Sequence, residues 1–397
     1  MATTDERPMT VEPGTSGTIR ASRARPTGRT ASRSNGGRTT PRKPGPVLVR
    51  QVRGGVEESV HRGDVVQADV DGALIRGLGD PDRVANLRSC VKPFGVVALI
   101  EAGGIEAFDL EPAELALMAS SHSGEDLHVR TLQALYRRAN LSQGLIATGT
   151  EGMPLDALTA ARLARDGERP SAVRHMCSGQ HSVFLLLSRL KDWDPAEYWL
   201  EDHPAQVAYR AVVARAFGTT PSKLRLSIDG CGVPTYAFRL REIARAYALL
   251  AEPSAVRASD PRASLAPALT LVRDAMLANP EMVAGTRDRL DTSLMKALPG
   301  RVVSKGGMEA LRGLALLPRA SSPSAASGIA LKIEDGDGYE RGTWAATVEV
   351  LGQAGIADAQ ALRVLARYHR PADVDPHGRV GAEAIAEFEL APLKELI

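Results

Sequence analysis

A serine and a lysine three residues apart are the first side chains in this sequence that could do chemistry together. Ser89 and Lys92 stand in the run LRSCVKPF over residues 87–94, and at a helix start this spacing puts both on one face. A buried or cation-crowded lysine loses its proton near neutral pH, and a neutral amine beside a hydroxyl is a general base for acyl transfer. The pair is a candidate catalytic dyad. Taken alone, the same spacing is also common in a helix start with a solvated lysine.

Two later segments supply a second serine and a second lysine. Residues 121–125 read Ser-His-Ser-Gly-Glu after an apolar helical run, which places Ser121 at a helix end, and Lys305 precedes two glycines on a short β-branched run. Serine enzymes of the penicillin-binding and β-lactamase kind assemble a Ser-x-x-Lys, a second serine motif and a lysine-bearing strand edge in this order. We therefore expect Ser89 with Lys92 and Ser121 with Lys305 to face one cleft.

The elements that must position these residues are strands at both ends of the chain and helices between them. Alternation and turn residues predict strands at 47–52, 59–61, 65–70, 329–333 and 344–351. Apolar spacing predicts helices over 127–141, 183–190, 207–217 and 265–276. The acidic glycine run 334–338 lacks the spaced ligands of a calcium loop and is interpreted as a hairpin turn. The predicted class is α/β (α+β), with one antiparallel sheet assembled from N- and C-terminal segments around a helical region.

Charge separates the first 45 residues from the rest. Residues 1–45 carry nine Arg and Lys against three Asp and Glu, a net charge of +6, so the remainder carries −4 of the total of +2. This basic segment has few large apolar side chains and cannot offset its ordering entropy. We expect a disordered tail over 1–45 and a catalytic domain over 46–397. A nucleic-acid tether is the weaker interpretation, because the tail lacks interleaved aromatics.

Composition limits the remaining classes. We find no apolar run of the length needed to span a membrane and no secretory leader, so the cytoplasm is the expected location, with neither a membrane nor a nucleic acid as partner. The three cysteines are an odd count, which argues against a disulfide framework. Cys177 and Cys231, with His175 or His181, could instead hold zinc. The alternative is that these thiols are simply buried, since no CxxC spacing is present.

Six segments in the same order and approximate spacing resemble the bacterial asparaginase II family, the thermolabile rhizobial type. They are Arg88-Ser89-x-x-Lys92-Pro93-Phe94, Ser121-His122-Ser123-Gly124-Glu125, His175-x-Cys177-Ser178-Gly179-x-His181, Asp229-Gly230-Cys231-Gly232-Val233-Pro234, Met282-Val283-Ala284-Gly285 and Val303-x-Lys305-x-Gly307. The resemblance extends from about residue 49 to the C-terminus. It implies a fold similar to serine β-lactamases and glutaminases, and a homodimer that hydrolyses L-asparagine to L-aspartate and ammonia.

The resemblance also implies roles for individual residues. The two Ser/Lys pairs become the catalytic pairs, Asp229 helps to hold the α-amino group of the substrate, and Arg88 and His181 complete the substrate-binding set. We expect Ser89 to attack the side-chain carboxamide while its neighbouring lysine takes the proton. The second pair relays a proton to the departing ammonia, and water resolves the acyl-enzyme.

Three positions depart from the family pattern. Gln180 replaces the lysine that joins the two cysteines as a zinc ligand, and a neutral carboxamide binds zinc poorly, so zinc is a doubtful cofactor. Gly95 replaces a glutamine, and Cys90 replaces a smaller residue beside the nucleophile. Two alternatives therefore stay open. One is a serine hydrolase or acyltransferase of β-lactamase-like fold that acts on another amide or ester, and the other is a non-catalytic amino-acid-binding protein.

Overall fold

The computed structural model describes residues 43–149, 154–169, 171–318 and 325–392. Contacts divide the chain into residues 1–43 and a second unit, residues 44–397, which contains every element named below. The basic tail predicted over residues 1–45 lies outside the described residues except for its last three positions.

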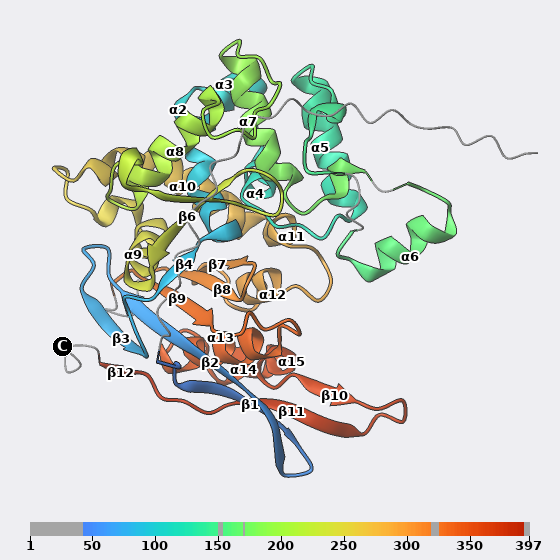
Figure 1. Ribbon diagram of the computed structural model, residues 1–397, viewed down its shortest axis with the longest axis vertical. Coiled ribbons are helices and arrows are strands. Elements are labelled where there is room, and N and C mark those ends of the chain that lie inside the picture. Colours follow the sequence, from blue (N-terminus) through green and yellow to red (C-terminus); the bar gives the residue numbers. More distant parts are fainter. Residues whose placement is uncertain (1–42, 150–153, 170, 319–324, 393–397) are drawn as a thin grey trace, which may run out of the picture. The chain divides into compact units, whose positions relative to one another are not determined.

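An antiparallel sheet is assembled from both ends of the second unit (Figure 1). Its strands run in the order β10 (Ala372–Val374), β11 (Val380–Ala386), β1 (Val47–Arg53), β2 (Val56–Ala68), β9 (Ser327–Ile333), β8 (Leu311–Leu316) and β7 (Val302–Gly307). At its side, β3 (Leu74–Leu78) pairs with β2 and with β12 (Ala391–Pro392). A small second sheet has the order β4 (Val84–Asn86), β6 (Pro234–Arg239) and β5 (Arg225–Ile228). The expected α+β class, with one sheet from both ends of the domain, is confirmed.

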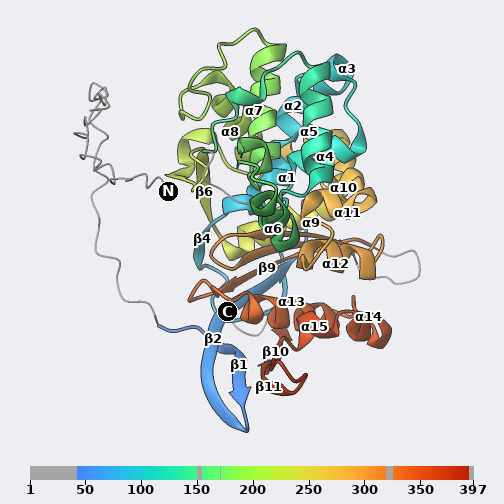
Figure 2. The same ribbon diagram turned by 90° about the vertical axis from the view of Figure 1, so that its right-hand side faces the viewer.

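Helices occupy the sequence between the two sets of strands and cover both faces of the large sheet (Figure 2). Those of the inserted region are α1 (Lys92–Gly95), α2 (Val97–Glu101), α3 (Gly104–Phe108), α4 (Pro112–Met118), α5 (Asp126–Arg138), α6 (Ala157–Arg165), α7 (Ser178–Leu190), α8 (Pro204–Ala216), α9 (Leu240–Ala251), α10 (Ala266–Ala278), α11 (Pro280–Val283) and α12 (Leu290–Ala297). Three more follow the last long strand: α13 (Arg341–Gln353), α14 (Ala359–Val364) and α15 (Ala366–His369). Short 3-10 turns join several of them, and one, η1 (Arg88–Val91), leads into α1.

Strand alternation sends neighbouring residues of the sheet into two separate cores. On β9, Ile329 and Leu331 belong to the core shared with α13, whereas Ala330 belongs to the core shared with α9 and α10. The face toward α9 carries small residues, because Gly328 and Gly313 stand there too, and a Cβ on Gly328 would overlap the backbone of α9. Small residues therefore let α9 pack directly on the sheet, and the two-residue period of the strands decides which side chains reach the helical region.

Three expected features were wrong. The predicted strands at 59–61 and 65–70 merge into one continuous strand, β2, which ends at Ala68, because Gly63 lets the backbone of β9 approach where a turn was expected. Residues 344–351 form most of helix α13 rather than a strand, and residues 334–338 accordingly lead into a helix and not into a hairpin. The β-branched residues there favour a strand locally, but their burial against the sheet on one helical face overrides that preference.

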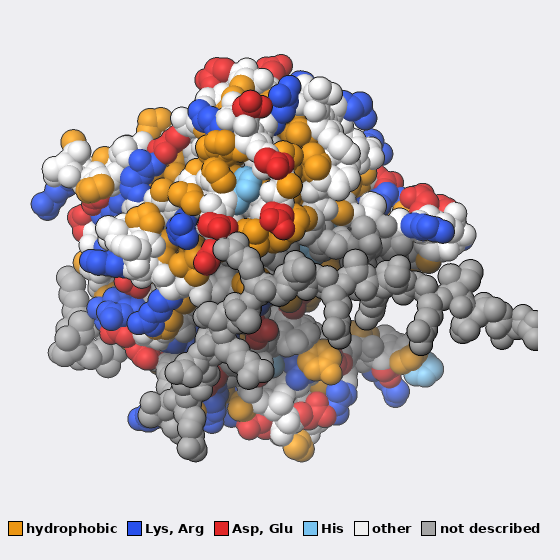
Figure 3. Space-filling model, turned by 45° about the horizontal axis from the view of Figure 1, so that its top comes forward, with side chains coloured by type: hydrophobic (Ala, Val, Ile, Leu, Met, Phe, Trp, Pro, Cys, Tyr) orange, Lys and Arg blue, Asp and Glu red, His pale blue; other side chains and the backbone are white. Residues whose placement is uncertain are grey.

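The surface shown in Figure 3 mixes basic, acidic and apolar side chains, with no large area of one sign of charge. Within the described ranges, no helix combines the length and the apolar character needed to cross a membrane.

We expect Gly328→Ala to lower the free energy of unfolding by about 1–3 kcal/mol or more, because the added methyl group overlaps the backbone of α9. The matched control is Gly352→Ala on α13, where a Cβ would meet only leucine side-chain atoms at 3.7 Å and alanine favours the helix. Urea unfolding of both variants measures the difference. Equal stability of the two variants would contradict the close contact between α9 and β9.

Candidate active site

Ser89 lies in η1, directly after a residue with strained backbone. Arg88 has a φ of 47°, in the left-handed region that non-glycine residues rarely adopt. Three interactions hold it there: its N–H donates to Thr235 Oγ1 at 3.0 Å, its Nε donates to Asp229 Oδ1 at 2.7 Å, and Cys90 Sγ next to Ser89 donates to the Lys305 carbonyl at 3.2 Å. Strain that is held in this way is typical of functional turns, and here it fixes the direction of the Ser89 side chain.

The Ser121 hydroxyl lies between two buried lysine amines. Lys305 Nζ is 2.8 Å from Ser121 Oγ, and Lys92 Nζ is 3.3 Å from the same atom. Both lysines are almost fully buried, at 0% and 1% exposure. Each amine also donates to a backbone carbonyl, Lys305 to that of Gly306 at 2.7 Å and Lys92 to that of Ser120 at 2.7 Å. The hydroxyl can thus accept from one amine and donate to the other, which makes it a proton link between them.

The alternation of β7 turns Lys305 toward η1 and α1, whereas Ser304 turns toward α12. Burial lowers the pKa of Lys305 to about 7, although the carboxylate of Asp291 opposes this shift. Nearby Lys92 and Arg289 lower it further, and Cys90 raises it. Asp291 itself is ionised: Arg312, Lys305, the Ser304 hydroxyl and the Gly306 N–H outweigh its burial and hold its pKa well below the usual range. A lysine that titrates near neutral pH can act as a base.

The pairing expected between Ser89 and Lys92 is not formed as a hydrogen bond. Ser89 lies in η1 and Lys92 at the start of α1, which follows directly. Lys92 donates instead to the Ser120 carbonyl, the Ser121 hydroxyl and the Cys177 sulfur. Among the described residues, the Ser89 hydroxyl makes no hydrogen bond, and it lines the cavity beside Ser121. Ser89 is therefore available to a ligand, while Lys92 is joined to the second pair through Ser121.

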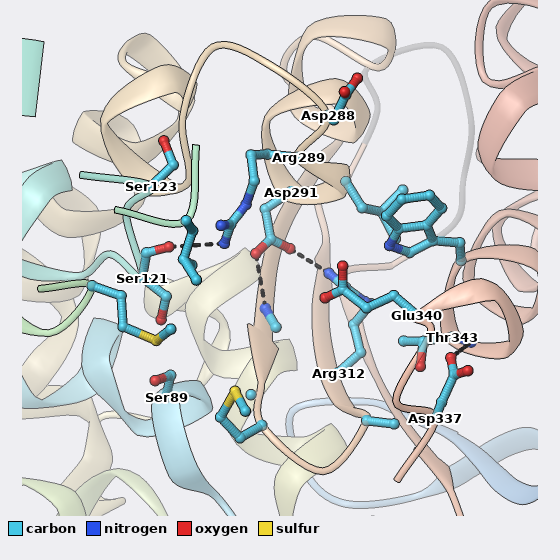
Figure 4. A pocket seen from close by; sticks show the side chains of 18 of the residues that line it. Ser89, Ser121, Ser123, Asp288, Arg289, Asp291, Arg312, Asp337, Glu340 and Thr343 are labelled. Atoms are coloured by element: carbon cyan, nitrogen blue, oxygen red, sulfur yellow. Dashed lines mark hydrogen bonds and ion pairs between the residues drawn. The ribbon is translucent and has the colours of Figure 1, made fainter. Parts of the chain in front are cut away.

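A cavity of about 540 Å³ opens onto both serines (Figure 4). Ser89, Ser121 and Ser123 lie on one side of it, Asp337, Glu340 and Thr343 on the other, and Arg289 and Asp291 between them. The outer wall adds apolar side chains, Leu155, Leu158, Met308 and Trp344. Its volume is within the range of small-molecule sites.

The two cysteines of the predicted metal site approach each other next to Lys92. Hydrogen bonding with Cys231 holds the pKa of Cys177 well below its usual value against the effect of burial, and Lys92, whose Nζ is 3.2 Å from the sulfur, lowers it further. The partner thiol, Cys231, has a raised pKa. The two thiols are coupled, because the hydrogen bond between them lowers the pKa of Cys177 and raises that of Cys231.

The donors near these thiols do not fit zinc. No group of three or more His, Cys, Asp and Glu side chains that could hold a metal occurs in the part of the chain that the structure describes. Gln180, at the position of the expected third ligand, donates from Nε2 to the Tyr209 hydroxyl at 3.2 Å. Position 95 borders the same tyrosine, since a Cβ on Gly95 would overlap the Tyr209 ring. Tyr209 therefore occupies the space that the two replacements leave open.

The residues predicted to bind substrate are placed differently from one another. Arg88, the residue before Ser89, forms an ion pair of 2.7 Å with Asp229, and neither of the two is among the residues that line the cavity. His181 is fully buried, its Nδ1 is 2.5 Å from the Tyr198 hydroxyl, and it is not among the residues that line the cavity. Burial lowers the pKa of His181 to about 3, so the ring is neutral. Asp291 and Arg289 were missed. Their only sequence signal is a run of charged residues after the Met282–Gly285 motif.

Comparisons with known proteins agree with these motifs. The model of the L-asparaginase II family matches residues 49–384. Among solved structures, a probable glutaminase from Bacillus subtilis in complex with 6-diazo-5-oxo-L-norleucine is 14% identical, over 74% of this chain and 84% of that chain, with a TM-score of 0.37. A Bacillus glutaminase is 13% identical over 74% and 91% of the two chains, with a TM-score of 0.38. No curated protein sequence matches the chain.

We expect one lysine to titrate near pH 7, protonated below that pH and neutral above it, because burial lowers the pKa of Lys305. NMR of the lysine side-chain nitrogens across pH 5 to 10 measures it, and Lys305→Arg assigns the signal. Asp291→Asn should move this titration to lower pH, since the carboxylate of Asp291 raises the pKa of the lysine. A Lys305 signal that titrates with the exposed lysines would contradict the electrostatics of this site.

Proposed function

The chain belongs to the L-asparaginase II family, and from this premise we propose that it hydrolyses L-asparagine to L-aspartate and ammonia. Membership of this family makes the protein an amidohydrolase. The observation that carries the finer proposal is the Ser121 hydroxyl held between two buried lysine amines, one of which has a pKa of about 7, at the wall of a cavity that also exposes Ser89. Hydroxyls and unprotonated amines arranged in this way are the groups that acyl transfer requires.

In the proposed reaction Ser89 is the nucleophile. Its hydroxyl lines the cavity and is not engaged with any described residue, so it can approach the carbonyl carbon of a bound carboxamide. As the bond from oxygen to carbon forms, the proton of Ser89 passes to Lys92, which stands three residues along the same turn. The backbone strain at Arg88 supports this choice, because the left-handed conformation of Arg88 directs the next side chain, that of Ser89, into the cavity.

Ser121 and Lys305 complete the proton path. Lys92, Ser121 and Lys305 are linked by hydrogen bonds of 3.3 and 2.8 Å. A proton that reaches Lys92 can therefore be shared with Lys305 and returned to the leaving nitrogen as the carbon–nitrogen bond breaks and ammonia departs. Water then attacks the acyl-enzyme, the same bases accept its proton, and Ser89 regains its hydrogen as the aspartate product is released. Atoms balance as amide plus water giving acid plus ammonia.

Two of the three sequence departures give little support to a different substrate. Gly95 and Gln180 both lie against Tyr209, and neither is among the residues that line the cavity. Their replacement therefore changes the surroundings of the thiol pair rather than the wall that a substrate would touch. Neither Asp229 nor Arg88 is among the lining residues, so Asp229 is proposed as the partner of the substrate amino group from the family alone.

From the family alone we also propose that the enzyme is a cytoplasmic homodimer. Light scattering of the full chain, with 42.2 kDa for one copy, tests the dimer, since a mass of one copy at all working concentrations would exclude it.

We expect Ser89→Ala to abolish the covalent intermediate and to lower kcat for ammonia release from L-asparagine by about 10³-fold or more. Ser121→Ala should lower kcat by about 10²- to 10⁴-fold, because it breaks the link between the two amines. A diazoketone analogue of asparagine followed by peptide mass spectrometry identifies the labelled serine. Label on Ser121 in the wild type would reverse the two serine roles. Full activity of either variant would remove that serine from the reaction. L-Glutamine, assayed in parallel, tests the substrate.

A further inference from the structure

The cavity contains one arginine without a carboxylate partner among the described residues. Arg287 pairs with Asp156 at 2.6 Å and with Glu125 at 3.2 Å, and Arg312 pairs with Asp291. Arg289 lines the same cavity but forms no ion pair with any carboxylate in the described ranges. Its guanidinium has five N–H donors, and the structure gives it one acceptor, the Ser121 carbonyl, which Nη2 meets at 2.9 Å. The remaining donors are left for a ligand.

The position of this guanidinium is fixed from both sides. Figure 4 shows Arg289 reaching from the start of α12 toward Ser121. The loop that carries it is held by Glu125, which accepts from the Thr286 N–H at 2.8 Å and the Thr286 hydroxyl at 2.5 Å. Glu125 is held in turn by the Ser123 hydroxyl at 2.6 Å. The cation is therefore built into the wall next to the reacting hydroxyls and is not a mobile surface side chain.

We propose that Arg289 binds the carboxylate of the amide substrate and thereby selects amides that carry a carboxylate near the reacting carbonyl. This inference rests on the proposed function, which it deepens by naming the group that orients the substrate. In L-asparagine only two carbon atoms separate the carboxylate from the carboxamide carbon, so a cation beside Ser121 is close enough to hold one end while the other end reacts. The planar fork of arginine suits a carboxylate, which it can bind with two parallel hydrogen bonds.

A site built around an unpaired cation discriminates strongly against substrates that lack the matching anion. Arg289 is partly exposed in the free protein, and a ligand without the anion would cover its guanidinium and give it no partner, at a cost to the binding of that ligand. The compound 3-aminopropanamide has the same carboxamide and amine as L-asparagine but no carboxylate. The wild-type protein should therefore prefer L-asparagine over this compound, and the preference should depend on Arg289.

The test compares Arg289→Met with Lys296→Met. Lys296 is a matched control, because it also places a basic side chain on the segment of α12, but it pairs with Glu281 at 3.3 Å and does not line the cavity. Arg289→Met should reduce kcat/KM for L-asparagine by about 10- to 100-fold, mainly by raising KM. The same variant should keep kcat/KM for 3-aminopropanamide within about twofold of the wild-type value. Lys296→Met should leave both unchanged. Equal losses on both amides would overturn the inference, since they indicate general damage.

Calorimetric binding of L-aspartate separates this inference from the proposed function. If the wild type binds L-aspartate and Arg289→Met weakens it at least about tenfold while melting at the same temperature, the carboxylate subsite stands even when L-asparagine is not hydrolysed. If the wild type does not bind L-aspartate, or if Arg289→Met binds it equally well, the subsite is rejected even when asparagine is hydrolysed. Arg289→Lys should recover part of the affinity, because it restores the charge without the fork.

Discussion

Two lysine amines buried around one serine hydroxyl are the constraint on which the rest of the site depends. A buried ammonium costs several kcal/mol unless it is paired or neutralised. In the described residues the only carboxylate that approaches these amines is Asp291, and Arg312 already shares it. Lys92 meets a carbonyl, a hydroxyl and the Cys177 sulfur. Within the described ranges, Asp291 is therefore the one carboxylate that offsets the burial of Lys305. Burial outweighs this carboxylate and lowers the pKa of Lys305 to about 7.

The fold supplies this cluster through three separate elements. Strand alternation places Lys305 on one face of β7 and Ser304 on the other, where the Ser304 hydroxyl donates to Asp291. The glycine and alanine face of β8 and β9 lets α9 pack close to the sheet, and the Tyr247 hydroxyl of α9 donates to the Cys90 carbonyl at 2.9 Å. The turn η1 is thereby pressed against β7 with Ser89 aimed into the cavity. The packing of α9 on the sheet therefore also determines the position of Ser89, since a shift of α9 would move the turn that carries this serine.

The two cysteines lie on the buried side of the site, and Arg289 lies on the side that faces the cavity. On the buried side, Tyr209 fills the space beside Gly95 and takes the amide of Gln180, so that Cys177 is left to face Lys92 without a third metal ligand. Lys92 is the amine that contacts this sulfur, and Lys305 is the amine whose pKa burial lowers to about 7. On the open side, Arg289 offers an uncompensated positive charge to the ligand. Buried groups therefore determine the pKa of Lys305, whereas Arg289 supplies positive charge on the side that faces the cavity.

Sequence alone was enough for the α+β class, for most of the strands and helices around the site and for the family, and it named the two serines and two lysines as candidates, because these rest on local periodicity and on residue types at short spacing. Prediction from sequence failed where contacts between residues far apart in the chain determine the structure. Helix α13 and the unbroken β2 depend on burial against other strands. Only the tertiary structure joined Lys92 to Ser121 rather than to Ser89, brought Asp291 beneath Lys305, and left Arg289 unpaired in the cavity. The physical reason is that proton affinity and ion pairing depend on distance and desolvation, which spacing along a chain does not contain.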